Sequence, residues 1–228
     1  MKTSILLRSI LISASLALCV TAHAADRANL VIIFADDLGY GDLGCYGSPT
    51  IRTPHLDRMA AEGLRFTDFY SAAEVCTPSR AAILTGRYPI RSGMCGDRRV
   101  LFANSAGGLP PSEITIAEAL KPHGYATAHV GKWHLGIHPG GRPLDQGFEH
   151  SFGLPYSNDM DARPGLPRGA SAAPDPPHDG WNVPLLRDGQ VVEQPADQTT
   201  LTRRYTEYAQ QFIRGNKHGP FFLYFAHT

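Results

Sequence analysis

Residues 76–87 read Cys-Thr-Pro-Ser-Arg-Ala-Ala-Ile-Leu-Thr-Gly-Arg, and the rest of the chain is organised around this stretch. It predicts a short helix. Thr77 is a good N-cap residue, and Pro78 suits the first helical position because its missing N–H costs nothing there. Gly86 favours a left-handed C-terminal end, after which Arg87 lies near the negative end of the helix dipole.

Arg80 does not fit a helix of this kind. A cation in the first turn lies near the positive end of the helix dipole, which is unfavourable. An anion bound between Arg80, the free N–H groups and Cys76 would account for it, because residues four apart share a helix face. A helix start with an incidental cysteine is the alternative.

A buried strand is predicted over residues 29–35, a continuous apolar run typical of a strand covered on both faces. Asp36 and Asp37 follow directly, ahead of a glycine-rich loop at 38–44. Open α/β sheets bind ligands beyond the carboxyl ends of their strands. Two adjacent carboxylates there repel each other unless a cation lies between them, and oxygen ligands favour a hard metal. A turn in which one Asp caps a helix is the alternative.

A second strand is predicted at 125–130, followed by Gly-Lys-Trp-His-Leu-Gly at 131–136. Lys132 and His134 alternate, so in an extended chain their side chains point the same way. Taken alone, this pair is more simply explained as part of a solvated loop.

Together these segments resemble the type I sulfatases, the arylsulfatase A-like family. The resemblance rests on residues 76–87, on Asp-Asp-Leu-Gly-Tyr-Gly-Asp-Leu-Gly-Cys-Tyr-Gly at 36–47, and on 131–136. Gly-Leu-Pro-Tyr-Ser at 153–157 is similar to an arylsulfatase segment that carries a substrate-contacting serine. The resemblance implies an α/β, alkaline-phosphatase-like domain with a mixed sheet sandwiched by helices.

The resemblance also implies roles in hydrolysing a sulfate monoester to an alcohol and sulfate. Cys76, oxidised by a formylglycine-generating enzyme, would become formylglycine, whose aldehyde hydrate is the nucleophile, and Arg80 would orient that hydrate. Lys132 would contact the sulfate, and His134 would accept a proton as sulfate leaves. Ser157 would contact the substrate, although an ordinary turn serine explains that position nearly as well.

A divalent metal ion is implied as well, Ca²⁺ or alternatively Mg²⁺, with Asp36, Asp37 and the modified Cys76 as ligands. Ca²⁺ takes about six to eight oxygen ligands, more than these groups supply. In the family, a further histidine, an Asp-Asn pair and another lysine follow beyond the strand that here ends at Thr228. We therefore expect residues 25–228 to be the N-terminal portion of a sulfatase catalytic domain, truncated at its C-terminus.

Two other functions remain open at this point. A phosphate or phosphonate ester hydrolase would use the same fold and much of the same site. An inactive fragment or a non-catalytic binding protein would retain half of a site. If the chain is a sulfatase, the expected substrate is a small sulfate ester or a sulfated glycan.

The composition is consistent with one exported domain. The chain has 228 residues, is 43% hydrophobic and carries 21 basic and 21 acidic residues, so no nucleic-acid or membrane-surface partner is indicated. Residues 1–24 have the charged, apolar and Ala-x-Ala parts of a secretory signal peptide, which predicts a periplasmic or secreted protein. A membrane anchor is the competing interpretation, but the apolar run is short for a span.

Cleavage of the signal would leave three cysteines, Cys45, Cys76 and Cys95. An odd number of cysteines is consistent with one that stays unpaired and has a chemical role. Cys45 and Cys95 could pair in an oxidising compartment, and two free structural thiols are about as well supported.

Periodicity and turn signals predict the remaining elements. Helices are expected at 54–62, where Leu56, Met59 and Ala60 would face the core, after the capping box at 115–118, and at 201–214. A short strand is expected at 65–70 and irregular chain over 138–198, with a tight hairpin at 187–190. The apolar run at 220–228 predicts a strand left as an open sheet edge.

Overall fold

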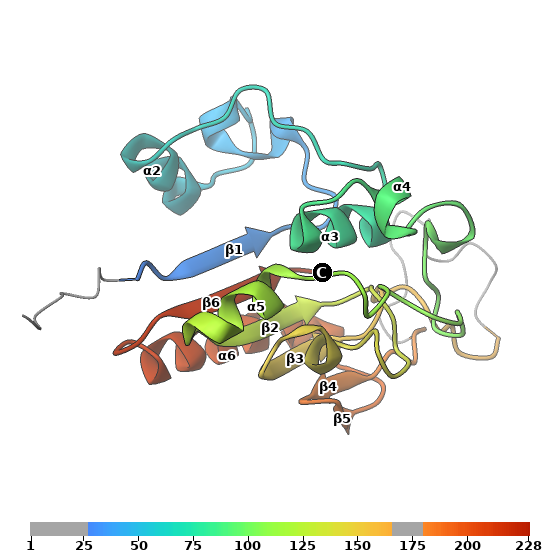
Figure 1. Ribbon diagram of the computed structural model, residues 1–228. Helices are drawn as coiled ribbons and strands as arrows, with labels where there is room; N and C mark the ends of the chain where they lie inside the picture. The colour runs from blue at the N-terminus through green and yellow to red at the C-terminus, as the bar shows by residue number, and fades with distance from the viewer. Residues whose placement is uncertain (1–26, 166–179) are drawn as a thin grey trace, which may run out of the picture.

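The structure is a computed structural model that describes residues 27–165 and 180–228 (Figure 1). The predicted signal peptide at 1–24 lies outside the described residues. So do four prolines of the segment predicted as irregular, namely Pro167, Pro174, Pro176 and Pro177.

A mixed, six-stranded sheet forms the centre of the fold, with the strand order β1-β6-β2-β3-β4-β5. The first four strands of that order are parallel, and the last two pair antiparallel. Their bounds are β1 Leu30–Phe34, β6 Phe221–Ala226, β2 Ala126–Lys132, β3 His150–Leu154, β4 Leu185–Arg187 and β5 Gln190–Glu193. This arrangement confirms the predicted α/β class and mixed sheet.

Strand β6 lies inside the sheet, so the prediction of an open edge at 220–228 is wrong. It pairs with β1 on one side and with β2 on the other. Its continuous apolar sequence is explained by this central position, because both faces are covered. The edge strands of the described sheet are instead β5 and β1. Strand β1 was predicted to be buried on both faces, but Val31 is 44% and Ile33 is 53% exposed.

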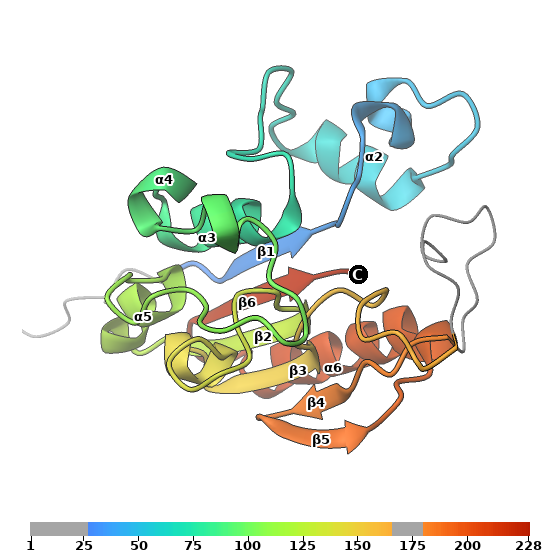
Figure 2. The same ribbon diagram turned by 90° about the vertical axis from the view of Figure 1, so that its right-hand side faces the viewer.

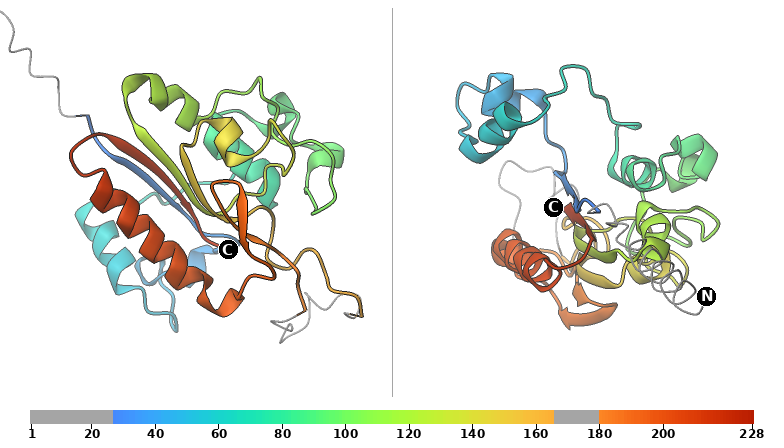
Figure 3. Two further views of the ribbon diagram at one scale, coloured as in Figure 1. Left: turned by 90° about the horizontal axis from the view of Figure 1, so that it is seen from below. Right: turned by 60° about the vertical axis from the view of Figure 1, so that its left-hand side comes forward.

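Helices cover both faces of the sheet. Helix α6 (Leu201–Gly215) packs on one face and buries the predicted core residues Leu201, Tyr205 and Phe212 against β2, β3 and β6. Figure 3 shows α6 lying along the strands. Helices α3 (Cys76–Thr85), α4 (Pro89–Ser92) and α5 (Ile116–Leu120) lie on the other side, where Ala81 and Leu84 of α3 join a second core.

The segment between β1 and α3 stands apart from the sheet (Figure 2). It contains two 3₁₀ turns, η1 (Tyr40–Asp42) and η2 (Gly44–Tyr46), and helix α2 (Pro54–Glu62). Helix α2 ends near Gly63 as predicted, but it has no buried residue and Met59 is 58% exposed. The predicted core role of this helix is therefore wrong in the described chain.

Local signals account for several other boundaries. The predicted capping box forms at the start of α5, where Thr115 and Glu118 exchange hydrogen bonds. The hairpin at Arg187–Gln190 also forms, with Asp188 and Gly189 in the left-handed conformation that such turns require. Further 3₁₀ turns are η3 Gly96–Arg98, η4 Lys121–His123, η5 Pro143–Gln146 and η7 Gln198–Thr200.

Two predictions about strands fail. Residues 65–70 form no strand because they lie outside the sheet, where the hydroxyl groups of Tyr40 and Tyr46 donate to the carbonyl oxygens of Phe69 and Phe66. The segment predicted as irregular over 138–198 contains β3, which pairs with β2 throughout its length. Among residues 27–165 and 180–228, no helix has the length and apolar character needed to cross a membrane.

Shortening a buried side chain on the interior strand β6 is expected to destabilise the protein far more than shortening a side chain on the edge strand β1. Leu223→Ala should lower the free energy of unfolding by about 2–5 kcal/mol, because Leu223 is fully buried and the change leaves a cavity. Val31→Ala on β1 should cost less than about 1 kcal/mol. Urea unfolding followed by circular dichroism measures both losses, and equal values would contradict the central position of β6.

Acid is expected to destabilise the fold through His129 of β2. Burial lowers the pKa of this ring from 6.5 to about 3. Between these values the unfolded chain binds more protons, so the free energy of unfolding should fall as the pH is lowered. His129→Phe should flatten this dependence in urea titrations at several pH values. A slope unchanged by the substitution would exclude His129 as its source.

Candidate active site

The candidate residues lie together at the carboxyl ends of two parallel strands and at the start of one helix. Asp36 and Asp37 follow β1, Lys132 ends β2, and Cys76 begins α3, which packs above this edge. Because parallel strands end at the same edge of a sheet, the sequence predicts that these residues lie together. The structure brings them there.

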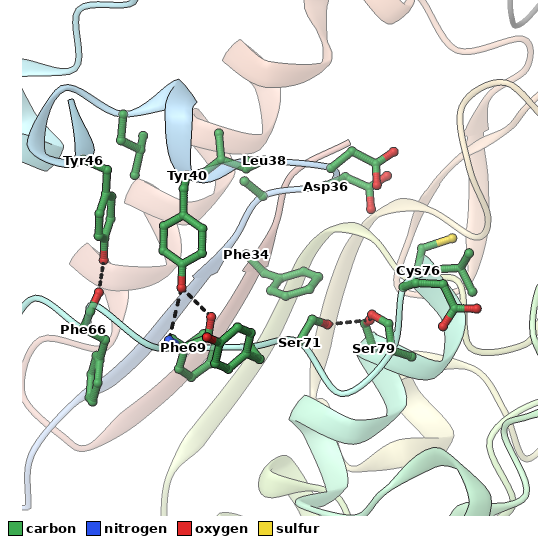
Figure 4. Close-up of a pocket in the computed structure, with 18 residues that line it drawn as sticks. Phe34, Asp36, Leu38, Tyr40, Tyr46, Phe66, Phe69, Ser71, Cys76 and Ser79 are labelled. Atoms are coloured by element: carbon green, nitrogen blue, oxygen red, sulfur yellow. Dashed lines mark hydrogen bonds between the residues drawn. The ribbon is translucent and has the colours of Figure 1, made fainter. Parts of the chain in front are cut away.

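A cavity of about 660 Å³ opens beside this edge. Asp36, Asp37 and Cys76 all line it, as Figure 4 shows for Asp36 and Cys76. Its lining also includes an aromatic group that the sequence did not point to, comprising Tyr40, Tyr46, Phe66, Phe69 and Tyr70. The cavity therefore combines a polar end around Cys76 with an apolar wall.

The anion that pairs with Arg80 is a side chain of the protein itself, the carboxylate of Asp36. Its side chain is fully buried and donates to Asp36 Oδ1 at 3.0 Å and to the main-chain oxygen of Lys132. The guanidinium carbon lies 5.2 Å from the centre of the Phe34 ring. Because α3 begins at Cys76, Arg80 is its fifth residue and lies beyond the first turn, so the predicted conflict with the helix dipole is wrong, and Asp36 compensates the buried charge.

Lys132 is bound from two sides. Its Nζ donates to Asp36 Oδ2 at 2.5 Å and to Ser157 Oγ at 3.1 Å, and the residue is 1% exposed. Burial raises the pKa of Asp36, but the hydrogen bonds and charges of Lys132 and Arg80 outweigh it, so the pKa lies below its ordinary value. Asp36, Arg80, Lys132 and Ser157 therefore form one hydrogen-bonded cluster in which the ionised form of Asp36 is favoured.

His134 has other partners. The prediction that it points the same way as Lys132 assumed extended chain, but the backbone of His134 is left-handed, with φ 60°. Its Nε2 lies 2.6 Å from the carbonyl oxygen of Leu101, and its Nδ1 is buried without a hydrogen-bond partner in the described part of the chain. Burial foremost, then the charge of Lys132, lowers the pKa of His134 to about 4, so the ring is neutral at pH 7.

The start of α3 differs from the predicted one. Val75, not Thr77, is the N-cap residue, while Gly86 ends the helix in the predicted left-handed conformation. The Thr77 hydroxyl is instead engaged with the main chain of His134 and Leu101. Sequence reasoning missed this role because no local signal links Thr77 to residues so distant in the chain.

The donor set for a metal ion is incomplete among the described residues. Asp36 and Asp37 border the cavity with Cys76, but both oxygens of Asp36 already bind cationic side chains. Residues 27–165 and 180–228 contain no group of three or more His, Cys, Asp or Glu side chains placed to hold an ion. These residues alone do not fit a Ca²⁺ site, which takes about six to eight oxygens.

The three cysteines within the described part of the chain are free thiols. Cys45, Cys76 and Cys95 are each partly buried and form no disulfide with one another. The alternative with two free structural thiols therefore describes this structure, and the pairing of Cys45 with Cys95 does not.

Comparison with known proteins identifies the family. A family model described as Sulfatase matches residues 28–227. The chain belongs to the sulfatase family. Human arylsulfatase A is 47% identical over 221 residues, which are 92% of this chain and 43% of that protein. The chain thus spans less than half the length of this curated relative.

Solved structures agree with the sulfatase assignment. The crystal structure of Ps i-CgsB is 32% identical, with a TM-score of 0.71 over 89% of this chain and 45% of that one. BT4656, solved with its substrate D-glucosamine-2-N,6-O-disulfate, is 28% identical with a TM-score of 0.65, covering 89% of this chain and 34% of that one. The sheet and helices described above are therefore those of the alkaline-phosphatase-like sulfatase fold.

Two neighbouring carboxylates are expected to differ sharply in their effect on stability. Asp36→Asn should lower the free energy of unfolding by about 2–4 kcal/mol, because it leaves the buried Arg80 and Lys132 without an anion. Asp37→Asn should change it by less than about 0.5 kcal/mol, because Asp37 is exposed and Asn tolerates its left-handed backbone. Chemical unfolding measures both, and similar losses would contradict the ion cluster.

Proposed function

We propose that this protein is a sulfuric ester hydrolase of the arylsulfatase type. The observation that carries the proposal is the position of Cys76. It begins a helix, borders the same cavity as Asp36 and Asp37, and precedes Arg80, which is bound to Asp36. Membership of the sulfatase family supports the same activity, although the chain spans 43% of arylsulfatase A.

Cys76 is the proposed site of the nucleophile. Formylglycine made from it, by a formylglycine-generating enzyme, supplies a hydrated aldehyde with one hydroxyl to attack sulfur and a second from which the aldehyde re-forms. An unmodified cysteine has no hydroxyl group on its side-chain carbon from which an aldehyde could re-form and expel sulfate, so the modification is needed for turnover. Arg80, four residues along the same helix, orients that group.

Three further residues are assigned roles. Lys132 neutralises charge on the sulfate oxygens, and Ser157, which accepts a hydrogen bond from Lys132 Nζ, contacts the substrate beside it. His134 accepts the proton that must leave the second hydroxyl when sulfate is released. Its neutral ring and its unpartnered Nδ1 support this role.

Asp36, Asp37 and the modified Cys76 are the proposed ligands of a divalent cation, Ca²⁺ or alternatively Mg²⁺. The donor set among residues 27–165 and 180–228 is incomplete for such an ion. Proteins use such a cation to stabilise negative charge on an attacking or bound oxygen.

The proposed substrate is a sulfate monoester of a small molecule or a glycan. The similar protein BT4656 was solved in complex with a sulfated sugar, D-glucosamine-2-N,6-O-disulfate, as its substrate. In this chain, the rings of Tyr40, Phe66 and Phe69 beside the polar end of the cavity suit the flat face of a ring-bearing alcohol. An exported, periplasmic or secreted location is proposed from the signal-like residues 1–24.

The modification can be tested by mass. The full chain is expressed with a formylglycine-generating enzyme and digested with trypsin. We expect the peptide containing Cys76 to be lighter by the difference between a thiol and an aldehyde. A peptide that keeps its thiol, in cells that convert a known sulfatase in parallel, would contradict the proposal.

The activity is tested on the modified protein with p-nitrophenyl sulfate and Ca²⁺, with p-nitrophenyl phosphate as the comparison. We expect release of sulfate, faster than release of phosphate, and its loss in Cys76→Ala and on chelation. Faster phosphate release would favour the phosphate ester hydrolase. Full modification without turnover of either ester would favour an inactive fragment.

A further inference from the structure

A closed set of hydrogen bonds around Thr77 fixes the loop that carries His134. Thr77 Oγ1 donates to the main-chain oxygen of His134 at 3.1 Å and accepts from the main-chain N–H of Leu101 at 3.3 Å. The carbonyl oxygen of Leu101 in turn lies 2.6 Å from His134 Nε2. Each of the three residues therefore contacts the other two, and all three are buried.

These contacts determine which ring nitrogen of His134 carries the proton. A carbonyl oxygen only accepts hydrogen bonds, so Nε2 must be the donor to Leu101. A neutral imidazole protonated on Nε2 has its free lone pair on Nδ1. That atom is buried and has no hydrogen-bond partner among the residues that the structure describes, which is unfavourable and calls for an explanation.

The backbone of His134 is held just as firmly. Its left-handed conformation, with φ 60°, is unfavourable for a residue with a side chain and persists only where the surroundings enforce it. The main-chain N–H donates to the carbonyl oxygen of Pro155 at 3.1 Å, and the main-chain oxygen accepts from Thr77. With the bond from Nε2, three hydrogen bonds hold this residue.

We propose that Thr77 is a positioning residue that, through Leu101, holds His134 in the Nε2–H tautomer with Nδ1 as its basic nitrogen. The proposal rests on the proposed function and deepens it, because a base that accepts a proton at one defined atom needs a single tautomer. In that step the O–H bond of the donating hydroxyl breaks and an Nδ1–H bond forms, while the electron pair left on oxygen forms the C=O bond of the aldehyde and the C–O bond to sulfate breaks, releasing sulfate. The ring becomes an imidazolium that keeps Nε2–H on Leu101, and its new proton then passes to water.

The test uses three substitutions in the full chain. Thr77→Val removes the hydroxyl and keeps the shape of the side chain, whereas Thr77→Ser keeps the hydroxyl. Thr127→Val is the matched control, because Thr127 is equally buried, donates to Gly147 at 2.9 Å and accepts from Glu149 at 3.0 Å. It therefore loses the same kinds of bond without touching Leu101 or His134.

The first measurement is the protonation of the His134 ring by ¹⁵N NMR, with its signals assigned by comparison with His134→Gln. The unsubstituted protein, Thr77→Ser and Thr127→Val should all show a proton on Nε2 alone. Thr77→Val should show a mixture of tautomers. A single Nε2–H tautomer in Thr77→Val, or a proton on Nδ1 in the unsubstituted protein, would overturn the proposal.

The second measurement is sulfate release by the formylglycine-containing protein. Thr77→Val should lower kcat by about tenfold or more while KM stays within about twofold, and Thr77→Ser should restore kcat. Thr127→Val should leave kcat unchanged. Equal kcat in Thr77→Val and the unsubstituted protein would overturn the proposal. If even the unsubstituted, fully modified protein is inactive, the proposed function fails, and the NMR result still decides the role of Thr77.

Discussion

The carboxylate of Asp36 joins three parts of the fold at one point. Asp36 lies just after β1. Its carboxylate accepts one hydrogen bond from Arg80 of α3 and another from Lys132 at the end of β2. Both cations are buried, and a buried charge is costly unless an opposite charge and hydrogen bonds compensate for it. The position of α3 over the carboxyl edge of the sheet, and with it the position of Cys76, therefore depends on this carboxylate.

Close backbone packing makes that position possible. A Cβ atom on Gly131 would lie 1.7 Å from the carbonyl oxygen of Ala226, and one on Gly153 would lie 1.8 Å from the oxygen of Gly131. No other residue fits at either position without moving a strand. Strands β6, β2 and β3 thus approach closely just before Lys132, which keeps its ammonium group within reach of both Asp36 and Ser157.

Sequence patterns located most elements but did not give the order of the strands. The apolar run of β6 predicts a strand, yet its place between β1 and β2 depends on pairings such as Leu30 with Phe222, which no local pattern records. The meeting of Asp36, Asp37 and Cys76 was predictable because strand ends share an edge. The contacts of Thr77 were not, because they join residues 57 and 24 positions apart.

Strands β1 and β2 both leave the sheet through residues with a left-handed backbone, Asp37 at φ 53° and His134 at φ 60°. Asp visits this conformation readily, whereas His134 is held in it by hydrogen bonds. The turn separates two side chains that alternation would have placed together. Lys132 stays beside the carboxylate of Asp36, where a cation is stabilised. His134 stays near Leu101, where burial and the charges of Lys132 and Arg80 favour its neutral form. Lys132 and His134 are only two residues apart in the sequence, but the turn of the backbone between them places the cation and the neutral base in different surroundings.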